Sequence, residues 1–293
     1  MSAENPPIAS TDRGSQGSTI GQHGSLLLCA TPIGNLEDVT LRVLRALAEA
    51  DVVACEDTRH TKLLLDRHSI VAASLVSFHE HNERARAQEL VARIAAGAVV
   101  ALVSDAGMPL VSDPGFALVR ACATAGLDVE VLPGPSAVVT ALVASGLPGE
   151  RWRFVGFLPR ARAELDRLLA DAPETLVAFE SPRRLAASLR VLATRDPRRP
   201  VAVCRELTKL HEEIRRGGAA ELAAHYDEHP PRGEIVIVVG AAAPGDSARA
   251  DALAAVRELV GAGARARPAA RVVAKLTGVG ANELYRRLTA EER

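Results

Sequence analysis

The sequence predicts an α/β protein of two domains followed by a small helical unit. Its 293 residues are 48% hydrophobic, enough to fill two ordinary cores. Aromatic residues make up only 3%, which favours sheets covered by closely packed helices over a sandwich or barrel. Strand-like apolar runs alternate with helical segments, the pattern of βαβ units and of a mostly parallel sheet.

The first domain is expected at residues 25–133, after a polar tail at 1–24 that lacks the apolar run of a signal peptide and is expected to be disordered. Strand-like runs fall at 26–30, 51–56, 75–78, 99–105 and 128–133. Amphipathic segments at 39–50, 83–97 and 116–126 are expected to be helices.

A second series predicts another α/β domain at residues 134–242. Its strand-like runs fall at 154–159, 175–180, 201–207 and 233–240. Residues 249–293 then form a third, small unit, with helices expected at 251–263, 266–276 and 282–288. This unit carries 9 Lys and Arg against 5 Asp and Glu, so it is either an RNA-gripping appendage or a helical lid.

Charge and cysteine usage exclude several classes of protein. The formal net charge of −1 makes the chain no polycation, so any nucleic-acid contact needs a local basic surface. Four widely spaced cysteines are predicted to be reduced core residues. No apolar run reaches the roughly 18 residues of a membrane span, so a cytoplasmic protein is expected.

Loops rich in glycine and proline follow three predicted strands: TPIGNLEDVT, DAGMPLVSDPG and PGPSAVVTA. Glycine allows close backbone approach, and open α/β sheets bind ligands at the carboxyl ends of their strands. Neither the phosphate-loop nor the dinucleotide-loop spacing occurs. The loops therefore predict a ligand site of another type, with simple turn geometry as the alternative.

This ordered set of loops resembles the tetrapyrrole-methylase-like superfamily of S-adenosylmethionine-dependent methyltransferases. Within it, segments spread over about residues 26–240 resemble the ribosomal RNA small subunit methyltransferase I family: ATPIGNLEDVTLR, CEDTRHTKLLL, SFHEHNE, VSDAGMPLVSDPG, LPGPSA, GFLPR, FESPRRL and CRELTKLHEEIRRG. The resemblance implies a class III two-domain fold, S-adenosylmethionine as cofactor, and 2′-O-methylation of a cytidine in 16S ribosomal RNA. It also implies a homodimer.

Cofactor contacts are expected in the three loops. Gly107 and Gly134 let backbone groups point inward, and Asp105 orders its loop or meets a cationic part of the cofactor. The resemblance adds Met108, Val111, Ser136 and Ala137, and also Pro32, Phe179 and Glu234.

Removal of the weakly acidic 2′-OH proton calls for a general base. Glu56 and Asp57 end one predicted strand, and Glu206 and Lys209 end another. Either pair could instead belong to a structural ion-pair network, so the sequence does not select the base.

Arginines near strand ends are candidates for RNA phosphate contacts. Arg59, Arg183 and Arg184 are predicted to bind RNA, with a solvated helix start as the alternative for the last two. The neighbouring pair Arg198 and Arg199 is expected in an exposed loop.

The histidines of SFHEHNE are expected to make polar contacts or to cap the next helix, and no metal site is expected. Two other functions remain open: a non-catalytic ribosome-binding or assembly factor on the same fold, and methylation of a small tetrapyrrole-like acceptor.

Overall fold

The computed structural model describes residues 24–170, 172–242 and 246–291; the predicted disordered tail lies outside these ranges except for Gly24. The chain divides into two compact units. The second unit begins at Gly134 but also includes residues 30–39 and 106–112 from the N-terminal half. Two of the predicted ligand loops therefore fold with the second unit.

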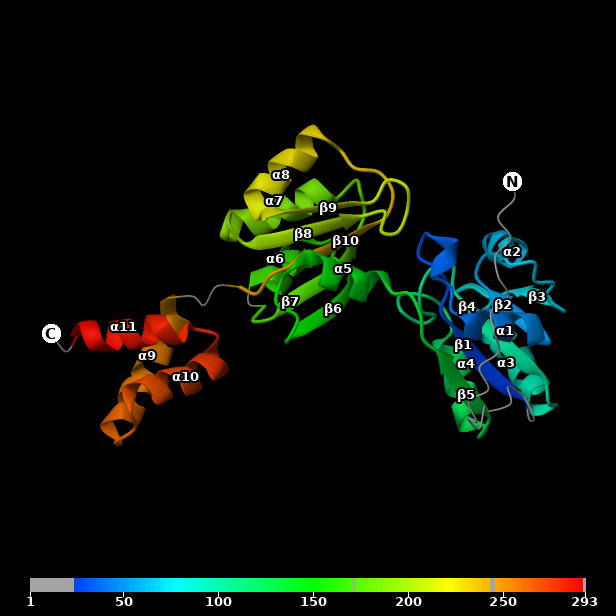
Figure 1. Cartoon of the computed structure of the whole chain (residues 1–293), viewed down its shortest axis with the longest axis horizontal. Coiled ribbons are helices and arrows are strands. Elements are labelled where there is room, and N and C mark those ends of the chain that lie inside the picture. Colours follow the sequence, from blue (N-terminus) through cyan, green and yellow to red (C-terminus); the bar gives the residue numbers. More distant parts are fainter. Residues whose placement is uncertain (1–23, 171, 243–245, 292–293) are drawn as a thin grey trace, which may run out of the picture. The chain divides into compact units, whose positions relative to one another are not determined.

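The first unit is built on a five-stranded sheet in which every pair of neighbouring strands is parallel (Figure 1). Its strands are β1 (Ser25–Cys29), β2 (Val52–Cys55), β3 (Leu75–Ser77), β4 (Val99–Val103) and β5 (Asp128–Leu132), in the order β3-β2-β4-β1-β5. Its helices are α1 (Leu41–Glu49), α2 (Thr58–Arg67), α3 (Glu83–Ala95) and α4 (Phe116–Thr124). Strands β1, β2 and β4 are buried along their whole length, as their unbroken apolar sequence predicts.

The second unit holds a mixed sheet. Its strands are β6 (Trp152–Phe157), β7 (Thr175–Glu180), β8 (Pro200–Arg205), β9 (Glu213–Gly218) and β10 (Ile235–Val239), in the order β6-β7-β10-β8-β9. Strand β10 runs antiparallel to both of its neighbours, and β8 and β9 are also antiparallel. The mostly parallel sheet expected from the pattern that begins at residue 25 is thus confirmed in the first unit, whereas the sheet of the second unit is mixed.

Helices cover both faces of this mixed sheet, because alternate residues of each strand point to opposite sides. Helix α5 (Ala137–Ser145) packs on one face, in a cluster that includes Val177, Val236 and Ile33 of the first loop. Helices α6 (Arg162–Ala170), α7 (Leu185–Arg195) and α8 (Ala219–Glu228) contribute to the cluster on the other face. Ile33 makes the first loop part of the core.

Three helices end the described chain: α9 (Asp246–Gly261), α10 (Ala266–Thr277) and α11 (Ala281–Glu291). They form a hydrophobic cluster of their own that includes Val256, Val273 and Leu284. Gly278, in the left-handed conformation, caps the carboxyl end of α10. The predicted third unit is therefore helical, with α9 beginning earlier than expected.

Two expectations about buried and exposed residues had different outcomes. The four cysteines are free and buried, as predicted. Arg199, expected in an exposed loop, is only 3% exposed because its guanidinium donates to the carbonyls of Gly240 at 2.8 Å and Leu169 at 2.7 Å.

None of the helices in the described ranges combines the length and apolarity of a membrane span.

Candidate functional site

Three loops meet in the second unit. Thr31 and Gly107 form an isolated antiparallel bridge, with N–H to O distances of 2.9 and 3.0 Å. Gly107 has φ +85°, and a Cβ atom there would lie 3.5 Å from Ile33 Cγ2 and 3.7 Å from the carbonyl oxygen of Pro135. The loops that begin near residues 30, 106 and 134 therefore converge, and Gly107 lies where they meet.

All of the predicted cofactor residues except Asp105 belong to this second unit. They are Pro32, Gly107, Met108, Val111, Gly134, Ser136, Ala137, Phe179 and Glu234. Phe179 and Ala137 pack against the same cluster that contains Ile33, which links strand β7 and helix α5 to the first loop. Convergence of these segments is a finding, whereas their contact with a cofactor stays a prediction.

The converging loops offer apolar side chains beside backbone polar groups. Met108 is partly exposed and Val111 is 39% exposed, while Pro32 is buried. The Ser136 hydroxyl accepts a hydrogen bond from Val139 N at 3.4 Å, so this side chain caps α5. Partly exposed apolar side chains such as Met108 and Val111 suit a ligand that is apolar in part.

Lys209 lies between two carboxylates of the second unit. Its Nζ donates to Glu206 Oε1 and to Glu234 Oε2, both at 3.0 Å. The hydrogen bond from the Glu234 backbone lowers the pKa of Glu206. Burial opposes ionisation of Lys209, but its bonds to Glu234 and Glu206 outweigh burial and raise its pKa. The contacts favour the ion-pair alternative for Glu206 and Lys209 over a proton-accepting role.

Asp57 is held as a carboxylate at the start of α2. It accepts hydrogen bonds from the Arg59 backbone at 2.9 Å and from the Arg59 side chain at 3.2 and 2.8 Å. The Arg59 side-chain bonds, followed by the backbone bond, lower the pKa of Asp57 to about 2. Such a group is a weak base at neutral pH, so helix capping accounts for Asp57 better than proton abstraction.

Glu56 and Asp113 have the opposite electrostatic character. Burial raises the pKa of Glu56, and the charge of Asp105 adds to the effect. Burial also raises the pKa of Asp113 to about 6, with the Glu56 charge adding to it and a hydrogen bond to Ser104 opposing it. Asp105 and Asp113 flank loop 106–112 in the chain. Glu56 and Asp113, both in the first unit, are therefore carboxyl groups whose raised pKa favours proton exchange.

Asp113 is the residue that sequence reasoning missed. It stands in an Asp-Pro-Gly sequence, which ordinarily signals a turn. Its raised pKa depends on burial and on Glu56, which is 57 positions away in the chain. The sequence signal that could have indicated Asp113 is its position in the DAGMPLVSDPG loop, where it is a charged residue between Gly107 and Gly115.

The histidines of SFHEHNE lie just before α3. The rings of His79 and His81 meet edge to face with centroids 5.8 Å apart. Asn82 accepts from His79 N at 2.9 Å and donates to Ser77 O at 3.1 Å, which fixes the turn into the helix. Within the described residues, no three His, Cys, Asp or Glu side chains are grouped so that they could hold a metal ion.

The predicted RNA-binding arginines differ in their surroundings. Arg184 donates to the carbonyls of Pro159 at 2.6 Å and Leu158 at 3.2 Å, and pairs with the fully buried carboxylate of Glu180 at 3.3 Å. Its side chain therefore anchors the GFLPR loop. Arg183 is exposed, and the side chain of Arg59 is 90% exposed although it pairs with Asp57. RNA contact by all three stays a prediction.

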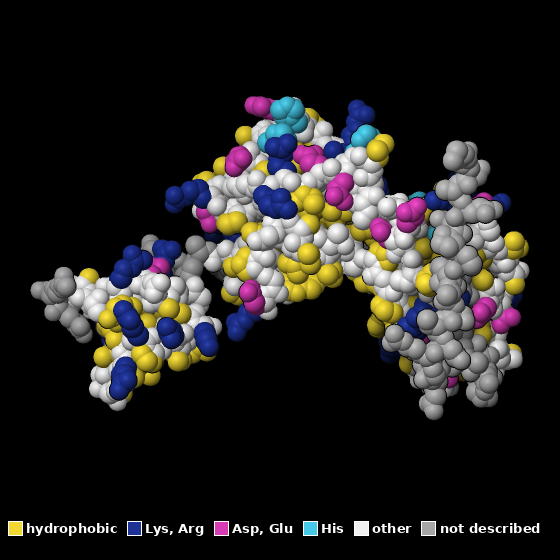
Figure 2. Space-filling model, viewed as in Figure 1, with side chains coloured by type: hydrophobic (Ala, Val, Ile, Leu, Met, Phe, Trp, Pro, Cys, Tyr) yellow, Lys and Arg dark blue, Asp and Glu magenta, His cyan; other side chains and the backbone are white. Residues whose placement is uncertain are grey.

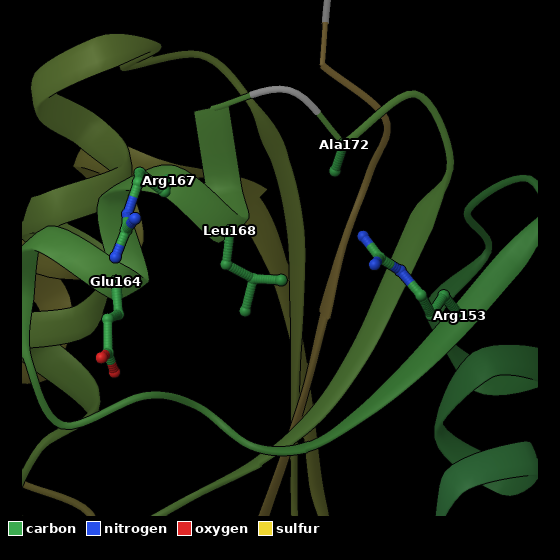
Figure 3. A pocket seen from close by; sticks show the side chains of 5 residues that line it. All are labelled: Arg153, Glu164, Arg167, Leu168 and Ala172. Carbon is green, nitrogen blue, oxygen red and sulfur yellow. The ribbon is translucent and has the colours of Figure 1, made fainter.

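A surface pocket elsewhere in the second unit contains none of the predicted site residues. It is lined by Arg153, Glu164, Arg167, Leu168 and Ala172 (Figure 3). Arg153, which points into it, already pairs with Glu174 at 2.9 Å. The loops described above remain the better candidate site.

Residues 25–223 match the family model for tetrapyrrole (corrin/porphyrin) methylases. The chain belongs to the tetrapyrrole methylase family. The predicted α/β methyltransferase fold is thereby confirmed, and the chain is a methyltransferase. The resemblance seen in the sequence motifs is confirmed by relatives within this family.

Two curated relatives are named ribosomal RNA small subunit methyltransferase I. The one from Mesorhizobium japonicum is 47% identical over 272 residues, covering 90% of this chain and 91% of its own. The one from Thermotoga maritima is 44% identical over 218 residues, covering 74% of this chain and 98% of its own. A solved uroporphyrin-III C-methyltransferase from Thermus thermophilus, complexed with S-adenyl homocysteine, has the same fold; it is 23% identical, with a TM-score of 0.52 over 74% of this chain and 97% of its own.

Proposed function

We propose that this tetrapyrrole methylase family member transfers a methyl group from S-adenosylmethionine to the 2′-oxygen of a cytidine in the ribosomal RNA of the small subunit. The names of relatives that match nearly the whole of their own length support the RNA substrate. The single structural observation that supports the proposal is the convergence of the loops at Thr31, Gly107 and Pro135.

S-Adenosylmethionine, when bound, supplies a methyl group on a sulfonium centre. The residues of the converging loops fit such a molecule. Gly107 has no side chain where the loops meet, and Met108, Val111 and Phe179 are apolar side chains that are not fully buried. The uncharged purine ring suits these apolar side chains.

The acceptor hydroxyl must lose a proton as the new C–O bond forms. We assign this task to the carboxyl pair Glu56 and Asp113, whose raised pKa values bring proton exchange toward neutral pH. Asp57, Glu206 and Lys209 are committed to ion pairs and are better explained as structural groups.

RNA contact is assigned to exposed cations. Arg183 and Arg59 remain candidates, and the C-terminal helices add Arg271 and Lys275. On the face shown in Figure 2, Lys and Arg side chains of this helical unit alternate with hydrophobic ones. Exposed cations such as these can contact the phosphates of a single-stranded RNA. The proposal includes a cytoplasmic location and, as the family resemblance implies, a homodimer.

Transfer of labelled methyl groups tests the proposal. The purified chain, labelled S-adenosylmethionine and small-subunit RNA should give RNA whose label lies on a cytidine ribose after digestion and mass spectrometry. Binding of the RNA without transfer would support an assembly factor instead. Transfer to a tetrapyrrole but not to RNA would support the small-acceptor alternative.

A further inference from the structure

The turn between β8 and β9 adopts an unusual backbone. Glu206 has φ +51° and Thr208 has φ +65°, in the left-handed region that non-glycine residues rarely occupy. A β-branched residue such as threonine is especially disfavoured there. Such a conformation persists only when surrounding contacts hold it in place.

Several contacts hold this turn. Glu206 exchanges backbone and side-chain bonds with Glu234: Glu206 N donates to Glu234 O at 3.0 Å, and Glu234 N donates to Glu206 Oε1 at 2.9 Å. The Thr208 N–H donates to Glu212 Oε2 at 2.6 Å. Gly233, with φ +87°, leaves the space that the Glu206 carboxylate fills, since a Cβ atom there would lie 2.3 Å from Oε1.

The strained turn presents Thr208 to the first loop. Thr208 Oγ1 accepts a hydrogen bond from the backbone N–H of Asn35 at 3.0 Å, across 173 positions of sequence. A Cβ atom on Gly34 would lie 2.7 Å from the same hydroxyl and 2.5 Å from Lys209 Cγ. Loop and turn are therefore packed so closely that residue 34 has no room for a side chain.

The same loop is fixed at its other end by the Thr31–Gly107 bridge, and Ile33 between the two ends is 6% exposed. Residues 31–35 are therefore held at both ends, at Thr31 by Gly107 and at Asn35 by Thr208. The contact at Asn35 depends on the hydroxyl group of Thr208, a residue whose backbone is strained.

We infer that Thr208 is a positioning residue for the cofactor loop and acts through Asn35, while Glu206, Lys209 and Glu234 brace the turn that presents it. The inference rests on the proposed function, because it takes residues 30–39 as part of the S-adenosylmethionine site. It assigns the CRELTK motif to loop placement and not to proton transfer.

Three substitutions at Thr208 test the inference by calorimetric titration of S-adenosylmethionine. Thr208→Val keeps the branched shape and the strain but removes the acceptor, so the Kd should rise about 2- to 12-fold, as for the loss of one neutral hydrogen bond. Thr208→Ser keeps the hydroxyl and should bind like the wild type. Thr208→Gly removes both hydroxyl and strain, so it should resist urea at least as well as Thr208→Val yet bind equally weakly.

Amide hydrogen exchange gives a readout that needs no cofactor. Exchange at Asn35 should accelerate in Thr208→Val and Thr208→Gly and not in Thr208→Ser. Thr124→Val, which makes the same change on an exposed helical threonine of the first unit, is the matched control and should alter neither readout.

Wild-type cofactor affinity in both Thr208→Val and Thr208→Gly would overturn this inference alone. A wild-type protein that binds no S-adenosylmethionine would instead refute the proposed function.

Discussion

The backbone N–H of Asp57 donates to Asp105 Oδ1 at 3.0 Å and so ties the residues that follow β2 to those that follow β4. These strands are parallel neighbours, so their carboxyl ends meet at one edge of the first sheet. Glu56 precedes the tied residue, and Asp105 contributes to its raised pKa. Several carboxyl groups thereby share one electrostatic environment but differ in their readiness to hold a proton.

The pH dependence of the free energy of unfolding should reveal the protonation of Asp113. Its pKa of about 6 in the folded protein lies above the usual 3.8, so the folded state binds the proton more tightly than the unfolded state. The free energy of unfolding should therefore lose this contribution as pH rises from about 4 through 6. Asp113→Asn should remove that loss. Measured by urea unfolding, the stability of the variant minus that of the wild type should therefore be larger at pH 8 than at pH 4.5. The exposed Asp128→Asn variant is the control, and an identical pH dependence in wild type and Asp113→Asn would contradict the assignment.

Glu56→Gln should separate chemistry from binding. Loss of a group that accepts the hydroxyl proton should lower the single-turnover methylation rate by about 10²-fold or more, with cofactor affinity nearly unchanged. Asp57→Asn is the comparison: asparagine can keep the cap of α2, so stability should change little and the rate should fall less than in Glu56→Gln. Equal rates for Glu56→Gln and wild type would remove Glu56 from the reaction.

Gly107→Val should abolish S-adenosylmethionine binding in calorimetry while the circular dichroism spectrum remains that of a folded protein. The new side chain meets Ile33 and the Pro135 carbonyl and forces φ away from +85°. Gly126→Val provides the matched strain control, since Gly126 has φ +67° with nothing within 4 Å of a Cβ atom. Binding by Gly107→Val as tight as by Gly126→Val would place the cofactor elsewhere.

The two arginines of the ESPRRL motif should behave differently. Arg184→Ala removes the cation beside the buried Glu180 carboxylate, which keeps its hydrogen bonds from Ser181 N and Ser188 Oγ, so stability should fall by about 1–3 kcal/mol. Arg183→Ala should leave stability unchanged but weaken RNA binding and reduce the salt dependence of the affinity by about one counterion. Denaturation and filter binding at several salt concentrations measure both. Unaltered RNA affinity and salt slope in Arg183→Ala would exclude a phosphate contact.

Removal of residues 246–293 should leave a folded protein that binds the cofactor. The Thermotoga maritima relative is matched over 98% of its length by only 74% of this chain, yet it carries the same name as the longer Mesorhizobium japonicum relative. The truncated chain should lose affinity for the ribosomal substrate and part of its salt dependence, because this segment holds 9 Lys and Arg. Aggregation or loss of cofactor binding would support the lid, and full methylation would show the segment to be dispensable.

Local sequence patterns predicted most of the fold, because unbroken apolar runs such as those of β1, β4 and β10 are buried whatever surrounds them. They missed β9, whose sequence EIRRGG has no apolar alternation and which forms a strand by pairing with β8. They also misjudged Arg199, because its carbonyl partners lie 30 and 41 positions away.

The candidate site was predictable as a set of loops but not as a geometry. Glycine and proline marked the loops around residues 32, 107 and 134, and the structure brings them together. The anchor from Thr208 to Asn35 and the raised pKa of Asp113 depend on contacts between distant segments. Sequence position carries no information about such contacts.

Ile33 is synthesised about 200 residues before Val236, and both belong to the same buried cluster. During translation, the first loop therefore leaves the ribosome long before its packing partners in β10 have been synthesised. The first sheet can assemble early from nearby strands, while the loop that leaves its first strand waits until β10 has emerged. Premature termination before that strand would yield a chain with a complete first sheet and a first loop whose buried cluster lacks Val236 and Val238.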